Sequence, residues 1–184
     1  QPQQPQQAKT RYGPQQAKKE DQHGSPTTSV NTISTTIVAL LKSFETMAGG
    51  NGTPGLIRSM LDDGSQNTWL TEKRRQELKL PIKGYATLRV GVAFGGGYGP
   101  LEKFPITEVD LTTEAGEIFT VDALVRTTPI CADAQVINFN PQERFKHLRN
   151  LKFADTYPRR SEEIDLLIGS DYYDSVITGR RRKG

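Results

Sequence analysis

The sequence predicts an all-β fold, a small β-barrel or β-sandwich with one or two short helices. Six short stretches are rich in β-branched and other apolar residues, and clusters of glycine, proline and polar turn residues separate them. These predicted strands span residues 36–44, 56–61, 85–94, 106–112, 118–125 and 166–168. In the stretch 118–125 the apolar residues alternate, which is typical of a strand with one buried face. The residues on that face are Phe119, Val121, Ala123 and Val125.

Helical signals are short and few. Thr71 is a good N-cap for a helix over residues 72–78, because its hydroxyl accepts from a free backbone N–H in the first turn, and Pro81 ends that helix. A last helical turn is predicted over residues 171–176. The stretch 138–160 is polar and is predicted to be irregular.

The first 30 residues differ in composition from the rest of the chain. Glutamine, proline and lysine dominate residues 1–30, and apolar side chains are almost absent. Such a segment cannot bury enough surface to offset the entropy lost on ordering. We therefore predict a disordered Gln/Pro-rich linker over residues 1–30 and one folded domain over residues 31–184. The chain begins with Gln1, and we expect it to be a piece of a longer polypeptide.

Composition argues against several classes of function. The single cysteine, Cys131, rules out an intrachain disulfide and suits a reducing compartment, so we expect an intracellular, cytoplasmic protein. No run of about 18 apolar residues is present, and we expect no membrane span. With one cysteine and two histidines, His23 and His147, the chain lacks the ligands of a structural zinc site. We expect no metal and no other cofactor.

The net charge of +3 is small, but the basic residues are clustered at positions 73–75, 159–160 and 180–183. Such clusters indicate either solvated helix faces and chain ends or a surface for nucleic acid. Aromatic residues do not interleave with the basic ones in these clusters, which favours the first interpretation. Any nucleic-acid contact is expected only through the basic tails.

A candidate catalytic carboxylate follows the predicted strand 56–61, in the turn Asp62-Asp63-Gly64. Two carboxyl groups that share one proton can activate a water for peptide hydrolysis, because like charges about 3 Å apart cannot both ionise. The sequence has one plausible turn of this kind, so the second carboxyl must come from a symmetric partner. Read alone, these three residues also fit an ordinary surface turn.

A second motif, Gly169-Ser170-Asp171, follows the apolar residues 166–168. Together with residues 62–65, and in this order, it resembles the two halves of a retropepsin-type aspartic protease subunit. The resemblance is to the protease domain of BEL/Pao-type retrotransposon polyproteins and covers about four-fifths of the chain, residues 35–184. It implies a retropepsin-like small closed β-barrel and an aspartic endopeptidase that cleaves its own polyprotein.

The resemblance also implies roles for individual residues. Asp62 of each subunit is expected to be catalytic in a homodimer. Gly64 permits the tight turn, and Ser65 is expected to hydrogen-bond the outer carboxylate oxygen. Gly169 and Asp171 belong to the strand end that crosses behind the turn and holds it in place.

Asp63 departs from the pattern of compact retropepsins, which have threonine or serine at the middle of the turn. That hydroxyl donates a hydrogen bond across the dimer axis, whereas an ionised carboxylate cannot donate, and two of them repel each other. A second interpretation is therefore a catalytically inactive, domesticated domain that keeps the fold and dimerises. A third is a basic polyprotein spacer that contacts nucleic acid through its tails.

A glycine-rich run after residue 94 is the candidate for the flap, the hairpin that closes over substrate in the resembling family. The run comprises Gly95, Gly96, Gly97, Tyr98 and Gly99. A plain flexible loop is an equal alternative. A phosphate-binding loop is disfavoured, because it needs a following helix and Pro100 and Pro105 oppose one.

Overall fold

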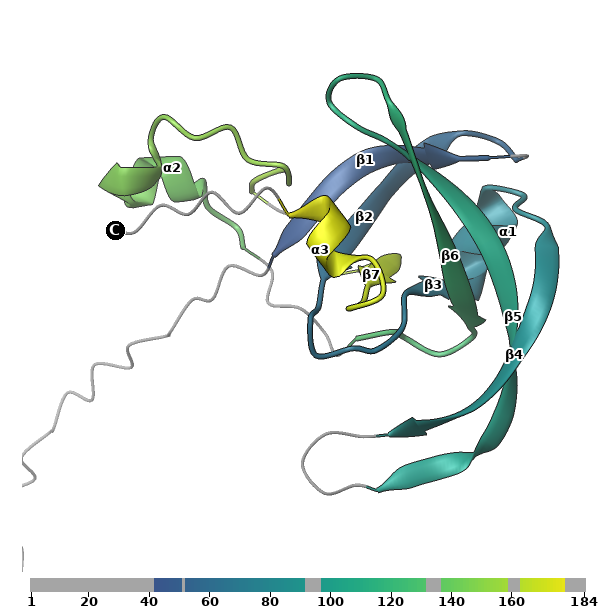
Figure 1. The fold of residues 1–184 in the computed structure, drawn as a ribbon. Helices are drawn as coiled ribbons and strands as arrows, with labels where there is room; N and C mark the ends of the chain where they lie inside the picture. The colour runs from purple at the N-terminus through teal and green to yellow at the C-terminus, as the bar shows by residue number, and fades with distance from the viewer. Residues whose placement is uncertain (1–41, 51, 92–96, 132–136, 159–162, 178–184) are drawn as a thin grey trace, which may run out of the picture. The chain divides into compact units, whose positions relative to one another are not determined.

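The computed structural model describes residues 42–50, 52–91, 97–131, 137–158 and 163–177 (Figure 1). The strands are β1 (Ser43–Gly49), β2 (Gly55–Leu61), β3 (Trp69–Thr71), β4 (Ile82–Gly91), β5 (Tyr98–Thr112), β6 (Ile118–Arg126) and β7 (Leu166–Ile168). The helices are α1 (Glu72–Glu77), α2 (Pro141–Arg144), the 3-10 helix η1 (Lys146–Leu148) and α3 (Tyr173–Val176). The linker predicted over residues 1–30 lies outside the described residues.

Within the described residues the strands pair in the order β1-β2-β7-β3-β6-β5-β4. β1 also pairs with β5, with Ala48 opposite Leu111 and Gly49 opposite Asp110, so that six strands close a ring. β4 continues the sheet beyond β5. Closure pairs the strand edges that an open sheet would leave exposed. The predicted all-β fold class, with short helices beside a ring of strands, is confirmed.

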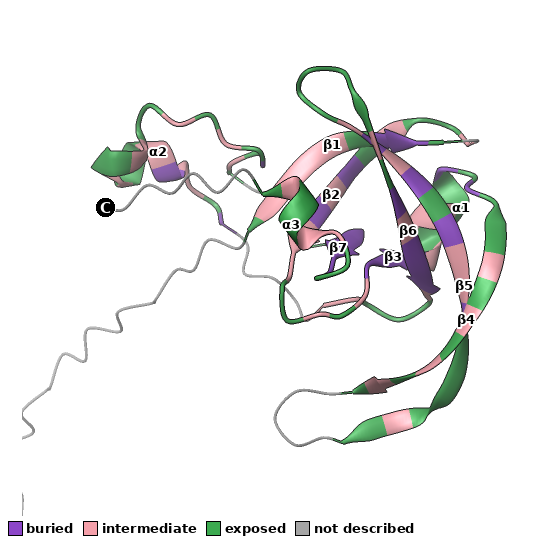
Figure 2. Ribbon diagram, in the orientation of Figure 1, coloured by how far each residue is buried: buried purple, intermediate pink, exposed green. Residues whose placement is uncertain are grey.

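The core of the ring consists of apolar side chains contributed by all six of its strands. The members without exposed surface are Ile57, Leu70, Val109, Val121, Ala123, Leu166 and Ile168. Each large aliphatic side chain of this kind contributes roughly 1.5–3 kcal/mol relative to an exposed one. Figure 2 shows buried residues gathered on the ring, whereas the far part of the β4–β5 pair is half-buried or exposed.

A second apolar cluster joins the β4–β5 hairpin to β3, β6 and β7. Its buried members are Trp69, Phe104, Leu124 and Leu167. The rings of Trp69 and Phe104 meet edge to face, with centroids 5.1 Å apart. Leu88 and Val90 of β4 pack against this cluster and are half-buried. The cluster therefore packs the outer part of β4, from Ala86 to Val90, against β3, β6 and β7. Figure 1 shows β4 and β5 as a long pair of strands.

β7 occupies the position on which the candidate site depends. It runs parallel to β2, with Met60 opposite Leu167, and antiparallel to β3, with Trp69 also opposite Leu167. The segment that connects β2 to β3 contains Asp62, so β7 lies between the two arms of the Asp62 turn. A strand covered on both faces is apolar throughout, which is why residues 166–168 are all aliphatic.

The strands β2, β6 and β7 begin and end within one residue of their predicted bounds, but β1, β4 and β5 differ from the prediction, and β3 was not predicted. β4 begins at Ile82, three residues before its predicted start, and residues 92–94 lie outside the described part. β1 begins at Ser43, near the end of the predicted strand 36–44, whose residues 36–41 lie outside the described part. β5 begins at Tyr98, inside the run predicted as a loop, because its first residues pair with β4 up to Gly91. A pairing partner elsewhere in the chain decided the start of β5.

The stretch predicted to be irregular, residues 138–160, contains α2 and η1. The Asn140 side chain accepts from the Gln142 N–H at 3.0 Å and caps α2, and the buried Pro141 takes its first position. In the part of the chain that the structure describes, no helix has the length and apolar character needed to cross a membrane.

We expect Leu166→Ala to lower the free energy of unfolding by about 2–5 kcal/mol, because the cavity would lie between β2 and β3, where neighbouring strands cannot collapse into it. Chemical denaturation would measure the loss. Ile118→Ala is the matched control: Ile118 is 61% exposed, and its removal should change stability by less than about 0.5 kcal/mol. Equal effects of the two substitutions would contradict the buried position of β7.

Candidate active site

Asp62 is the first residue after β2, and its backbone is fixed on both sides. Its N–H donates to the carbonyl of Ile168 in β7 at 2.9 Å, and its carbonyl accepts from the Ser65 N–H at 3.2 Å. Its side chain accepts from the Gly64 N–H at 3.0 Å. Asp62 is half-buried, so the turn presents an anchored carboxyl group that water and a peptide can reach.

Gly169 crosses directly behind this turn and is buried. A Cβ at this position would lie 2.5 Å from the carbonyl oxygen of Asn67 and 2.8 Å from that of Ser65. Both are backbone atoms that cannot move without distorting the turn. The Ser170 N–H donates to the same Ser65 carbonyl at 2.7 Å, which ties the two segments together. Glycine is therefore required here by the close approach of two backbones.

Asp171 and Thr68 complete this attachment. Asp171 accepts from the Thr68 N–H at 2.8 Å through Oδ2 and from the Thr68 hydroxyl at 2.7 Å through Oδ1. The same hydroxyl oxygen accepts from the Gly169 N–H at 3.1 Å. Thr68 has no exposed surface, and the sequence analysis did not single it out. Its position just before β3 was the available signal, since a buried hydroxyl needs partners.

Ser65 supports the turn in a different way from the expected one. Its hydroxyl donates to the carbonyl of Asn67 at 2.8 Å, two residues further along the chain. Its own backbone accepts the hydrogen bond from Ser170. In this structure Ser65 therefore stabilises the connection to β3 rather than contacting the Asp62 carboxylate.

Asp63 is exposed and faces Lys42 of the same chain. The Lys42 Nζ lies 3.8 Å from the Asp63 carboxylate and donates to the Tyr173 hydroxyl at 2.6 Å. The carbonyl of Lys42 accepts from the Leu61 N–H at 2.8 Å, so its backbone is attached next to Asp62. Lys42 links the turn to α3, and the sequence alone did not indicate this role.

The flap candidate is divided by the limits of the described residues. Gly95 and Gly96 lie outside them. Gly97 has a positive φ of 71°, and Tyr98 and Gly99 begin β5. Tyr98 is 79% exposed. The β4–β5 hairpin is therefore long, and its described residues next to the turn, Gly91, Gly97 and Tyr98, are exposed.

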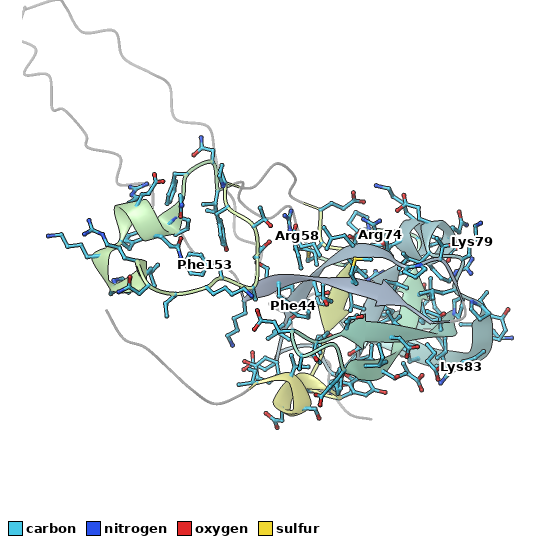
Figure 3. The ribbon with its side chains drawn as sticks, turned by 90° about the horizontal axis from the view of Figure 1, so that it is seen from above. Phe44, Arg58, Arg74, Lys79, Lys83 and Phe153 are labelled. Atoms are coloured by element: carbon cyan, nitrogen blue, oxygen red, sulfur yellow. The ribbon has the colours of Figure 1, made fainter. Side chains whose placement is uncertain are left out.

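Two arginine–aspartate pairs brace the segment that leads into β7 and the segment around Asp155, which lies beside β1. Arg74 of α1 donates to the nearly buried Asp165 at 3.0 Å. Burial opposes the charge of Arg74, but Asp165 and neighbouring acidic residues outweigh it and raise the pKa of the guanidinium. Arg58 of β2 donates to the buried Asp155 at 3.2 Å. Arg58 and Arg74 lie along the same side of the strands and line one cavity (Figure 3).

No family model matches the chain, and no curated protein matches it. Among solved structures it is similar to the retroviral protease-like domain of Ddi1 from Leishmania major, with 16% sequence identity and a TM-score of 0.31. The match covers 74% of this chain and 78% of that chain.

We expect Gly169→Ala to destabilise the domain by about 1–3 kcal/mol or more, because the added methyl group would overlap the backbone behind the Asp62 turn. Thermal unfolding would measure it. The matched control is Gly84→Ala in β4, where an added Cβ meets nothing within 4 Å and stability should not fall. An unchanged melting temperature for Gly169→Ala would contradict the close approach.

Proposed function

We propose that the chain is an aspartic endopeptidase of a retrotransposon-type polyprotein, active as a homodimer with Asp62 from each subunit. The observation that carries the proposal is the Asp62 turn itself. A half-buried carboxyl lies at the end of an apolar strand, and a second apolar strand passes behind it with a glycine that admits no side chain. The sequence resemblance stated above points to the same class of enzyme.

In the proposed mechanism the two Asp62 carboxyl groups share one proton around a water molecule. The ionised group takes a proton from the water, whose oxygen attacks the carbonyl carbon of the scissile peptide bond. The protonated group donates its hydrogen bond to the carbonyl oxygen as that oxygen gains charge. The pair now holds two protons. When the C–N bond breaks, the amine leaves with one of them, and the pair is left with a single shared proton as at the start.

The expected substrate is an extended segment of the chain's own polyprotein. The β4–β5 hairpin and its half-buried apolar residues, Leu88 and Val90, offer a strand and an apolar face to such a peptide. Met60 packs against the same apolar cluster and lies two residues before Asp62. A peptide held against this face would have its backbone near the turn.

The second candidate is an inactive dimerisation domain with the same fold. Asp63 is the observation that favours it, because its carboxylate replaces a hydroxyl that donates across the dimer axis in the resembling family. An ionised carboxylate only accepts hydrogen bonds. The nearby Lys42 compensates part of this charge, but its distance of 3.8 Å and the exposure of both groups make the ion pair weak.

We expect Asp62→Asn to lower peptidase activity roughly 10²-fold or more, because an amide can neither accept the proton of water nor share one. Cleavage of a peptide library at mildly acidic pH, with and without pepstatin, would measure it. The matched control is Asp174→Asn, an exposed carboxylate on α3, which should leave cleavage unchanged. Cleavage by Asp62→Asn at the wild-type rate would remove Asp62 from the mechanism.

We expect Asp63→Thr to tighten the homodimer at neutral pH, because a hydroxyl that can donate replaces an acceptor, and two like charges are removed. Sedimentation velocity at several protein concentrations would measure the dissociation constant. Asp174→Thr removes an exposed charge elsewhere and should have no effect. A dimer without any cleavage would support the inactive candidate, and a monomer under all conditions would contradict both candidates.

A further inference from the structure

The segment 137–158 carries a row of basic side chains that the proposed peptidase function does not use. Lys146, Arg149 and Lys152 follow one another at intervals of three residues, and all three are exposed. We call these three residues the basic row. The stretch was predicted to be irregular, and the basic row is separate from the basic clusters at residues 73–75, 159–160 and 180–183.

The local backbone places Lys146 and Arg149 on one side. The Leu148 N–H donates to the Phe145 carbonyl at 3.0 Å, Arg149 donates to Lys146 at 3.4 Å, and Leu151 donates to Leu148 at 3.0 Å. Such bonds between residues three apart define turns with about three residues each over residues 145–151, so Lys146 and Arg149 point the same way, and Lys152 follows directly after the last of these turns. Phe145, Leu148 and Leu151 form the complementary row and are half-buried.

The segment has a fixed base on the ring of strands. The Glu45 N–H of β1 donates to the Ala154 carbonyl at 2.7 Å. Asp155 is buried and accepts from Arg58 and from the Ser43 hydroxyl. The basic row is therefore carried by a segment that is anchored to the ring of strands.

Nearby acidic groups leave the row positive. Glu143 is the exposed acidic residue of the segment, and the charge of Asp155 is compensated by Arg58. Lys152 pairs with Glu114, but both side chains are about four-fifths exposed, so a polyanion can compete for the lysine.

Aromatic rings lie next to the row. The Arg144 guanidinium lies over the Phe139 ring at 4.6 Å and over the Phe145 ring at 5.9 Å. The exposed His147 lies beside Phe145, with centroids 6.1 Å apart. Cations that interleave with aromatic rings suit single-stranded nucleic acid, whose phosphates and bases require both.

We propose that the basic row binds single-stranded nucleic acid through its backbone phosphates, with the exposed His147 as the stacking surface for a base. Three residues at about 2.0 Å each separate Lys146 from Arg149 by about 6 Å along the segment, a spacing comparable to that of phosphates in an extended single strand. The carboxylates of an acidic protein would pair with the cations alone, whereas a nucleic acid also offers bases that stack on an aromatic ring. This binding does not depend on the proposed peptidase activity.

Fluorescence anisotropy of a labelled oligouridylate about 16 nucleotides long tests the proposal on the full chain. We expect the triple variant, which combines Lys146→Gln, Arg149→Gln and Lys152→Gln, to lose affinity roughly tenfold or more at about 50 mM salt. The slope of log affinity against log salt should lose about 2 units, since each phosphate contact contributes about 0.7. His147→Ala should weaken binding roughly fivefold or more without changing that slope, at a pH above the range in which histidine ionises.

A control variant removes three exposed cations elsewhere, through Lys73→Gln, Arg89→Gln and Lys103→Gln, and changes the net charge equally. It should bind with the wild-type salt slope, and both variants should unfold at the wild-type temperature because all six residues are exposed. Wild-type binding by the variant of the basic row would overturn the proposal, and so would equal losses in both variants. Displacement of the oligonucleotide by polyglutamate and by unlabelled RNA should also be compared. If polyglutamate is equally effective, the partner is an acidic protein and the proposal is overturned.

Discussion

The close passage of β7 and Gly169 behind the Asp62 turn is the constraint on which the rest of the structure depends. β7 pairs with β2 on one side and β3 on the other, so without it the ring of strands would open at the turn. The hydrogen bonds from Asp62 to Ile168 and from Ser170 to Ser65 require backbone contact that a side chain at Gly169 would prevent. A single glycine thus links closure of the ring to the position of the candidate carboxylate.

Several polar groups around this passage are paired, although in the described part of the chain the buried Ser59 Oγ and Arg74 Nε have no hydrogen-bond partner. Thr68 is fully buried, and its backbone and hydroxyl are engaged by Asp171 and Gly169. Asp165 leads into β7 and is neutralised by Arg74. Removing one partner of such a buried pair costs more than the net worth of the pair, because it leaves the other partner unsatisfied. The same network therefore stabilises the fold and limits movement of the turn.

The candidate active site and the basic row use different parts of the chain. The first depends on the meeting of β2 and β7, which are about 100 residues apart in sequence. The second is local, since Lys146 and Arg149 come to one side where the backbone turns every three residues, and Lys152 follows the last of these turns. Because they share no residue, substitutions in one are expected to leave the other intact.

The sequence by itself determined the elements whose signals are local. β7 was predicted with its observed bounds because a strand covered on both faces is apolar throughout, and Thr71 caps α1 with its own hydroxyl, as expected. The turn at Asp62 and the glycine at position 169 were also recognisable as motifs. Tertiary structure decided the rest. The start of β5 depends on β4, and the contacts of Thr68 with Asp171 and of Lys42 with Asp63 join residues far apart in sequence. No local pattern encodes such contacts, because they exist only after the ring has closed.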